Sequence, residues 1–93
     1  GRTVLMAAIA RNQPDIAKQI LYRDDVDINL QDKNSGTALM FAITKKRKAI
    51  TNKILTIPNV KVKLKNNNGI TALMMANKMH QTEIANEIRN KET

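Results

Sequence analysis

The sequence of 93 residues predicts a mostly α-helical solenoid of stacked antiparallel helix pairs joined by β-turn or hairpin loops. Three copies of one segment support this prediction, because residues 37–42 recur as residues 3–8 and again as residues 71–76. The copies begin with Thr at positions 3, 37 and 71, so the period is 34 residues. A fixed period between about 20 and 50 residues is typical of stacked repeats, in which neighbouring units bury one another.

The first unit is predicted to contain two short helices joined by a tight turn. Thr3 is a suitable N-cap for the first helix. Asn12 tolerates the left-handed backbone conformation that ends many helices. Pro14 suits the first turn of the second helix, because the N–H that it lacks would have no partner there. The second helix carries an apolar stripe that we expect to be buried, formed by Ile16, Ala17, Ile20 and Leu21.

Alternating polar and apolar residues follow this second helix. Val26, Ile28 and Leu30 occupy every second position, which predicts an extended segment with one buried face. Residues 32–36 are rich in Asp, Asn, Ser and Gly, which favour a turn. Thr37 then begins the next helix pair.

The second unit repeats this layout, and its extended segment alternates Val and Leu with lysines that we expect on one side. These lysines are Lys61, Lys63 and Lys65. The third unit ends differently, because Arg89 stands where Leu21 and Leu55 stand in the earlier units. The outer face of a terminal repeat contacts solvent, so a charged residue is expected there in place of the apolar residue of the inner repeats. The first unit has no such exchange, so we expect further repeats before it.

The repeated Thr-Ala-Leu-x-x-Ala core and the turn over residues 32–36 resemble the ankyrin repeat. The resemblance implies one ankyrin-repeat domain over residues 1–93, with units 1–34, 35–68 and a capping unit 69–93, as part of a longer array. The sequence departs from the family at several positions. Met replaces the family's His at Met6, Met40 and Met74. Ser35 occupies the turn position where the family has Gly. The Gly that often ends the first helix is replaced by Asn12, Lys46 and His80.

Residues suited to catalysis or metal binding are few. The Met series at helical spacing is expected to be core, with Met79 near the ligand-binding end of a first helix as the exception. His80 is the only His and there is no Cys, so neither a nucleophilic triad nor a zinc site is expected. The acidic cluster at Asp24, Asp25, Asp27 and Asp32 lacks the spacing of a calcium loop. We therefore expect no enzyme activity, no cofactor and no metal.

Basic residues are concentrated in the middle of the chain. The net charge is +8, and residues 33–82 contain ten basic residues and no acidic one. This surplus favours an acidic partner, although a solvated surface on a compositionally biased sequence explains it equally well. Nucleic acid or an anionic membrane is the alternative partner for residues 33–82. The chain has only two aromatic residues, so a stacking platform for single strands is not expected.

The leading functional hypothesis is a non-catalytic module that binds a partner protein or acidic peptide. By resemblance, binding uses the hairpin tips and the ends of the first helices, which line a concave surface. We expect the chain to act inside the cell, in the cytoplasm or nucleus, or as an exported effector. A monomer is expected, with self-association through the uncapped N-terminal face as the alternative. By repeat position, the binding residues are Arg2, Arg11, Lys33, Asn34, Thr44, Lys45, Asn67, Asn68, Ile70, Lys78 and Met79.

Overall fold

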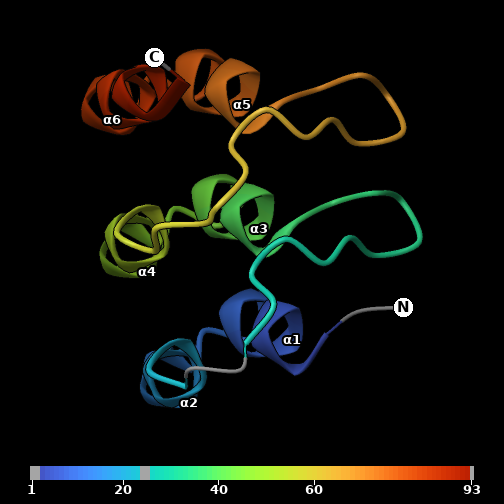
Figure 1. The fold of residues 1–93 in the computed structure, drawn as a ribbon, viewed down its shortest axis with the longest axis vertical. Helices are drawn as coiled ribbons and strands as arrows, with labels where there is room; N and C mark the ends of the chain where they lie inside the picture. The colour runs from blue at the N-terminus through green and yellow to red at the C-terminus, as the bar shows by residue number, and fades with distance from the viewer. Residues whose placement is uncertain (1–2, 24–25, 93) are drawn as a thin grey trace.

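The computed structural model describes residues 3–23 and 26–92, which form helix pairs stacked one above another (Figure 1). The first helices of the pairs form one column and the second helices form another, while the hairpin loops project to one side. The predicted mostly α-helical repeat solenoid is confirmed. Within the described residues the helices are α1 (Val4–Ala10), α2 (Pro14–Leu21), α3 (Ala38–Thr44), α4 (Lys48–Leu55), α5 (Ala72–Lys78) and α6 (Thr82–Glu92).

Each first helix begins at a threonine N-cap. The Oγ1 atom of the threonine accepts a hydrogen bond from the backbone N–H three residues later, at 3.1, 3.3 and 3.2 Å in the successive units. This bond satisfies one of the N–H groups that a helix start leaves unpaired. The caps are Thr3, Thr37 and Thr71, so the cap predicted at Thr3 is confirmed.

Each first helix also ends in the same way. Asn12, Lys46 and His80 have φ of 56°, 58° and 59°, so the left-handed conformation expected at these positions is present. The next N–H closes the turn by donating to a carbonyl five residues earlier, as Arg47 does to Ala42 at 2.8 Å. This is the Schellman arrangement, which satisfies a free carbonyl and reverses the chain into the second helix.

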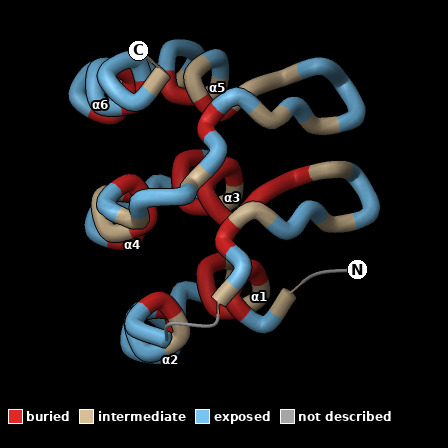
Figure 2. Tube along the Cα trace, in the orientation of Figure 1, coloured by how far each residue is buried: buried red, intermediate tan, exposed pale blue. Residues whose placement is uncertain are grey.

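The core lies between the two columns and between the stacked pairs, where Figure 2 shows buried residues on the facing sides of the helices. Helix α3 contacts both α1 and α5, and α4 contacts both α2 and α6. Leu39, Ile43 and Ile54 of the middle unit are at most 2% exposed. Near the end of α6, Ile88 is fully buried, and Arg89 is exposed as expected for a charged residue on the terminal repeat.

Two helical residues that were predicted to be buried are exposed. Met74 is 49% exposed, whereas its repeat equivalents Met6 and Met40 are 1% and 3% exposed. The helices that carry those two residues, α1 and α3, each pack against the first helix of the following unit, whereas no described unit follows α5. Ile16 is 44% exposed, whereas its repeat equivalent Ile50 is 3% exposed. Ile16 lies on α2 of the first helix pair, and no described helix pair precedes it to cover this side chain.

The segments predicted to be extended contain turns instead. A turn occupies residues 28–29, where Asp27 Oδ1 accepts the Asn29 N–H at 3.0 Å, and another occupies residues 62–63. The turn breaks the alternation, so Ile28 is buried but Leu30 is 48% exposed. The chain must turn here to pass from the second helix of a pair to the hairpin. No helix within residues 3–23 and 26–92 is long and apolar enough to cross a membrane.

Candidate functional site

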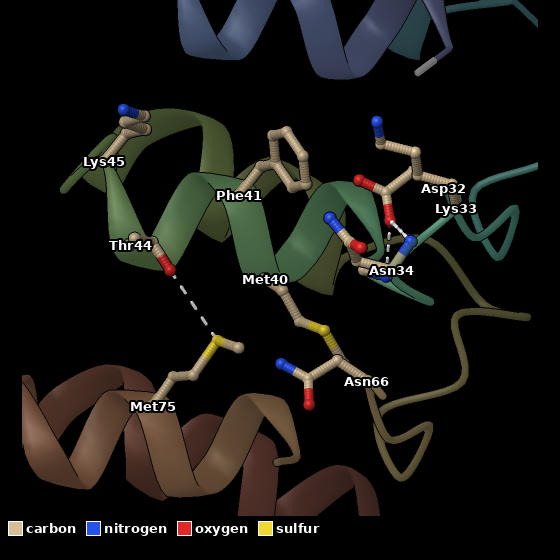
Figure 3. Close-up of a pocket in the computed structure, with 10 residues that line it drawn as sticks. Asp32, Lys33, Asn34, Met40, Phe41, Thr44, Lys45, Asn66 and Met75 are labelled. Carbon is tan, nitrogen blue, oxygen red and sulfur yellow. Dashed lines mark hydrogen bonds between the residues drawn. The ribbon is translucent and has the colours of Figure 1, made fainter. Parts of the chain in front are cut away.

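A groove of about 560 Å³ lies between the first hairpin, helix α3 and the unit that follows (Figure 3). Its walls come from three repeated elements: the hairpin over residues 32–36, the outer face of α3, and the start of the next unit. We call this feature the α3 groove. It is lined by Asp32, Lys33, Asn34, Gly36, Met40, Phe41, Thr44, Lys45, Asn66 and Met75.

One carboxylate holds the hairpin that forms the upper edge of the α3 groove. Asp32 Oδ1 accepts the backbone N–H groups of Asn34 at 2.9 Å and Gly36 at 2.8 Å (Figure 3). The Asp32 N–H donates in turn to the Gly36 carbonyl at 2.9 Å. Such Asp-to-backbone bonds fix a tight turn. The carboxylate therefore supports the loop, and Lys33 at its tip is exposed.

The second hairpin has the same construction and is attached to the first. Asn66 Oδ1 accepts the N–H groups of Asn68 at 2.9 Å and Ile70 at 3.0 Å. Between the tips, the Asn67 N–H donates to the Asn34 carbonyl at 2.9 Å. Asn67 Oδ1 also accepts from the Ser35 hydroxyl at 2.8 Å. These bonds give two successive hairpins a fixed relative position.

Helix α3 supplies an apolar surface flanked by polar groups. Phe41, Thr44 and Lys45 are three or four positions apart, so they share one helical face. Figure 3 shows Phe41 between Lys45 at one end of the helix and Lys33 at the other. The Phe41 ring lies close to Gly36, where an added Cβ would stand 3.2 Å from Phe41 Cε1. The absence of a side chain at Gly36 therefore leaves room for the ring.

The charge around the α3 groove is positive at its edges. Lys33 and Lys45 are exposed, and neither forms an ion pair with another residue that the structure describes. Asp32 is the single acidic residue of the lining, and one of its oxygens is already bonded to two backbone N–H groups. A ligand in this groove would therefore meet an exposed lysine on either side of an apolar surface.

Other basic residues of the middle segment have partners elsewhere. Lys48 pairs with Glu83 at 3.2 Å, and Lys53 lies 4.2 Å from the centre of the Tyr22 ring. Arg47 donates to the Ile9 carbonyl at 3.4 Å. The ten basic residues of positions 33–82 thus lie at the hairpin tip, in the turn between α3 and α4, on α4, on the connecting segment and on α5.

The structure brings four of the sequence-predicted binding residues together in the α3 groove: Lys33, Asn34, Thr44 and Lys45. Asn67, Asn68 and Ile70 lie on the second hairpin, outside the lining. Arg11 is the exposed C-cap of α1, Lys78 ends α5, and Met79 lines a separate hollow of about 490 Å³ beside His80. Arg2 lies outside the described residues, as do Asp24 and Asp25 of the acidic cluster.

Sequence reasoning missed the apolar part of this site. Phe41 is not among the predicted binding residues, yet it is half-buried and lines the α3 groove together with Met40 and Met75. The helical spacing from Phe41 to Thr44 and Lys45 was a usable signal. No group of three or more metal-ligating side chains occurs within the part of the chain that the structure describes.

Comparison with known proteins agrees with this architecture. The family model for ankyrin repeats, in three copies, matches residues 5–93. Among curated proteins, none matches the sequence of this chain. A solved structure of Bd0816, a predatory endopeptidase from Bdellovibrio bacteriovorus, in complex with the immunity protein Bd3460 contains a similar chain. The similarity has a TM-score of 0.79 at 28% sequence identity, and it covers 97% of the present chain and 46% of that one. The present chain thus spans less than half the length of the chain that it matches. From its match to the three-copy model over nearly its whole length, the chain belongs to the ankyrin repeat family.

Proposed function

We propose that this chain is a non-catalytic protein-interaction module that binds an acidic segment of a partner protein in the α3 groove. The observation that carries the proposal is the pair of exposed lysines, Lys33 and Lys45, at the edges of a groove with an apolar surface. Protein interfaces typically combine a desolvated apolar centre with a polar rim. Complementary charge at the rim speeds association and selects the partner.

Membership of the ankyrin repeat family supports this proposal, because ankyrin repeats are generally protein-binding modules. The similar chain belongs to a structure of an endopeptidase with an immunity protein, which is itself a complex between two proteins. The hydrogen bonds between the hairpin tips also support it. A surface that is rigid before binding loses less conformational entropy when a partner docks.

The alternative partner is nucleic acid or an anionic membrane. Its support is the surplus of basic residues over positions 33–82. Two observations count against it. Partners within the chain already engage Lys48, Lys53 and Arg47, and the other basic residues of positions 33–82 are distributed over several elements. Binding to phosphates by such a surface would be steeply dependent on salt and insensitive to sequence.

A charge-reversal experiment separates the two proposals. The double variant Lys33→Glu/Lys45→Glu changes the groove, and Lys61→Glu/Lys63→Glu makes the same charge change on the connecting segment. Binding is measured by fluorescence anisotropy with a labelled acidic peptide, a labelled 24-base-pair duplex and anionic vesicles at physiological salt. The proposal predicts that only the groove variant, Lys33→Glu/Lys45→Glu, loses binding of the acidic peptide. Equal loss of peptide binding in both variants would favour nucleic acid or an anionic membrane as the partner. A dissociation constant near micromolar for the duplex at this salt concentration would do the same.

A further inference from the structure

The tip of the second hairpin contains the only Asn-Gly pair of the sequence, Asn68-Gly69. An Asn side chain loses its amide without any enzyme when the backbone nitrogen of the next residue attacks it. Glycine favours this attack because it has no side chain to hinder the approach. A Cβ added at Gly69 would meet no atom within 4 Å, so the surroundings leave the site open. Asn68 is exposed, and its side chain makes no hydrogen bond to another described residue.

The first hairpin provides an internal comparison, because Asn34 occupies the same repeat position as Asn68. In each hairpin the N–H of this asparagine donates at 2.9 Å to the side chain two residues earlier. The following residues, Ser35 and Gly69, have similar backbone conformations, with φ of 63° and 76°. The two sites therefore share their turn geometry and differ in the residue that supplies the attacking nitrogen.

The stacking of the hairpins covers Asn34 and leaves Asn68 uncovered. The Asn34 carbonyl accepts the Asn67 N–H at 2.9 Å, and the Ser35 hydroxyl donates to Asn67 Oδ1 at 2.8 Å. Among the described residues none donates to the Asn68 carbonyl, because no described hairpin follows the second one. The second tip is thus held from one side only. Segments held by fewer contacts open locally at a lower cost in free energy.

From these observations we infer that Asn68 is a site of spontaneous deamidation and that opening of the second hairpin tip limits its rate. The Gly69 N–H donates to the Asn66 carbonyl at 2.9 Å, so the nitrogen is free to react only after this turn opens. The nitrogen then bonds to Cγ of Asn68, and Nδ2 leaves as ammonia with the proton of the peptide nitrogen. Water opens the resulting cyclic imide at either carbonyl and gives aspartate or isoaspartate. The inference is independent of the proposed function.

The reaction changes the hairpin that holds the first tip. Either product replaces a neutral amide by a carboxylate, so the net charge of +8 falls by one. In isoaspartate the chain continues through the side chain, which lengthens the backbone between the N–H groups of Asn68 and Ile70. Both N–H groups donate to Asn66 Oδ1 in the intact hairpin. The isoaspartate form should lose this pair of bonds and unfold at a lower urea concentration than the original chain.

The test incubates the 93-residue chain at neutral pH and follows each asparagine by mass spectrometry of tryptic peptides. Trypsin cleaves after Lys33 and Lys65, so Asn34 and Asn68 are measured in separate peptides. Isoaspartate is detected by its enzymatic methylation. Deamidation at Asn68 should be at least several-fold faster than at Asn34. Equal rates at the two positions, or a faster reaction at Asn34, would overturn the inference, and this comparison needs no variant.

The exchange Gly69→Ser tests the role of the attacking residue. It gives the second hairpin the residue that the first has at this position, and deamidation at Asn68 should slow several-fold. Circular dichroism checks that the variant is folded. The same exchange in a synthetic peptide with the sequence of residues 64–72 measures the chemical effect where no fold is involved. An unchanged rate in both the chain and the peptide would overturn the assignment of the site.

The unsubstituted peptide tests whether opening of the tip limits the rate. It has no hairpin contacts with the first tip, so it should deamidate several-fold faster than the folded chain. Asn67→Ala removes the side-chain bonds between the tips and should move the rate in the chain toward that in the peptide. Equal rates in the peptide and the folded chain would overturn control by opening of the tip.

Discussion

The Asn67 side chain donates from Nδ2 to the carbonyl oxygen of Lys33 at 3.3 Å, which places the tip of the second hairpin directly against the tip of the first. With the backbone bond from Asn67 to Asn34, it joins residues one repeat apart. The position of Lys33 at the edge of the α3 groove therefore depends on the unit that follows. The backbone of Lys33 in one repeat is thus held by a polar side chain of the next.

We expect Asn67→Ala to reduce stability and to loosen this edge. The change removes the bonds to the Lys33 carbonyl and from the Ser35 hydroxyl, and the free energy of unfolding should fall by about 1 kcal/mol. The matched control is Asn68→Ala, because the Asn68 side chain makes no hydrogen bond to another described residue. Urea denaturation followed by circular dichroism measures both. Equal effects of the two substitutions would show that the contact between the tips contributes nothing.

Gly36→Ala should destabilise the chain through a clash with Phe41. The added Cβ would stand 3.2 Å from Phe41 Cε1 and 3.3 Å from Asp32 Oδ1, so the ring or the carboxylate must shift slightly to admit it. Overpacking of this kind costs about 1–3 kcal/mol. The double variant Gly36→Ala/Phe41→Leu should cost less than the sum of the single variants, because the smaller side chain relieves the clash. Additive free energies of unfolding in this double-mutant cycle would exclude direct coupling.

Met40 and Met74 occupy the same repeat position and should respond very differently to alanine. Met40 is 3% exposed, so Met40→Ala should lower the free energy of unfolding by about 2–5 kcal/mol. Met74 is 49% exposed, so Met74→Ala should change it by no more than about 0.5 kcal/mol. Thermal and urea denaturation provide the comparison. Similar losses for both would contradict the packing described for the third unit.

Lys46→Asn should stabilise the chain. Lys46 has φ of 58°, and the left-handed conformation costs a residue with a long side chain about 1–2 kcal/mol, whereas Asn adopts it more readily. We expect the free energy of unfolding, measured by urea denaturation, to rise by about 0.5–1 kcal/mol. Lys63→Asn removes the same charge at an exposed position outside the left-handed turns and serves as the control. No difference between the two variants would show that Lys46 is not strained.

Features governed by neighbouring residues in the chain could be predicted from the sequence. The 34-residue period, the cap at Thr3 and the left-handed turns at Asn12, Lys46 and His80 all depend on contacts within a few positions. The same holds for the exposure of Lys33 and Lys45, which follows from their places in the repeat. Local backbone geometry and periodic spacing are properties of the sequence itself.

Features governed by the stacking of units required the tertiary structure. Repeat equivalence suggested equal burial of Met40 and Met74, but a side chain is buried only when another unit packs against it. The same reasoning explains the exposure of Ile16. The α3 groove is also a tertiary feature, because Phe41 meets Gly36 from its own unit and Met75 lines the groove from the next. The sequence by itself determined the repeat and its turns, whereas the packing between repeats decided which of its side chains remain available to a partner.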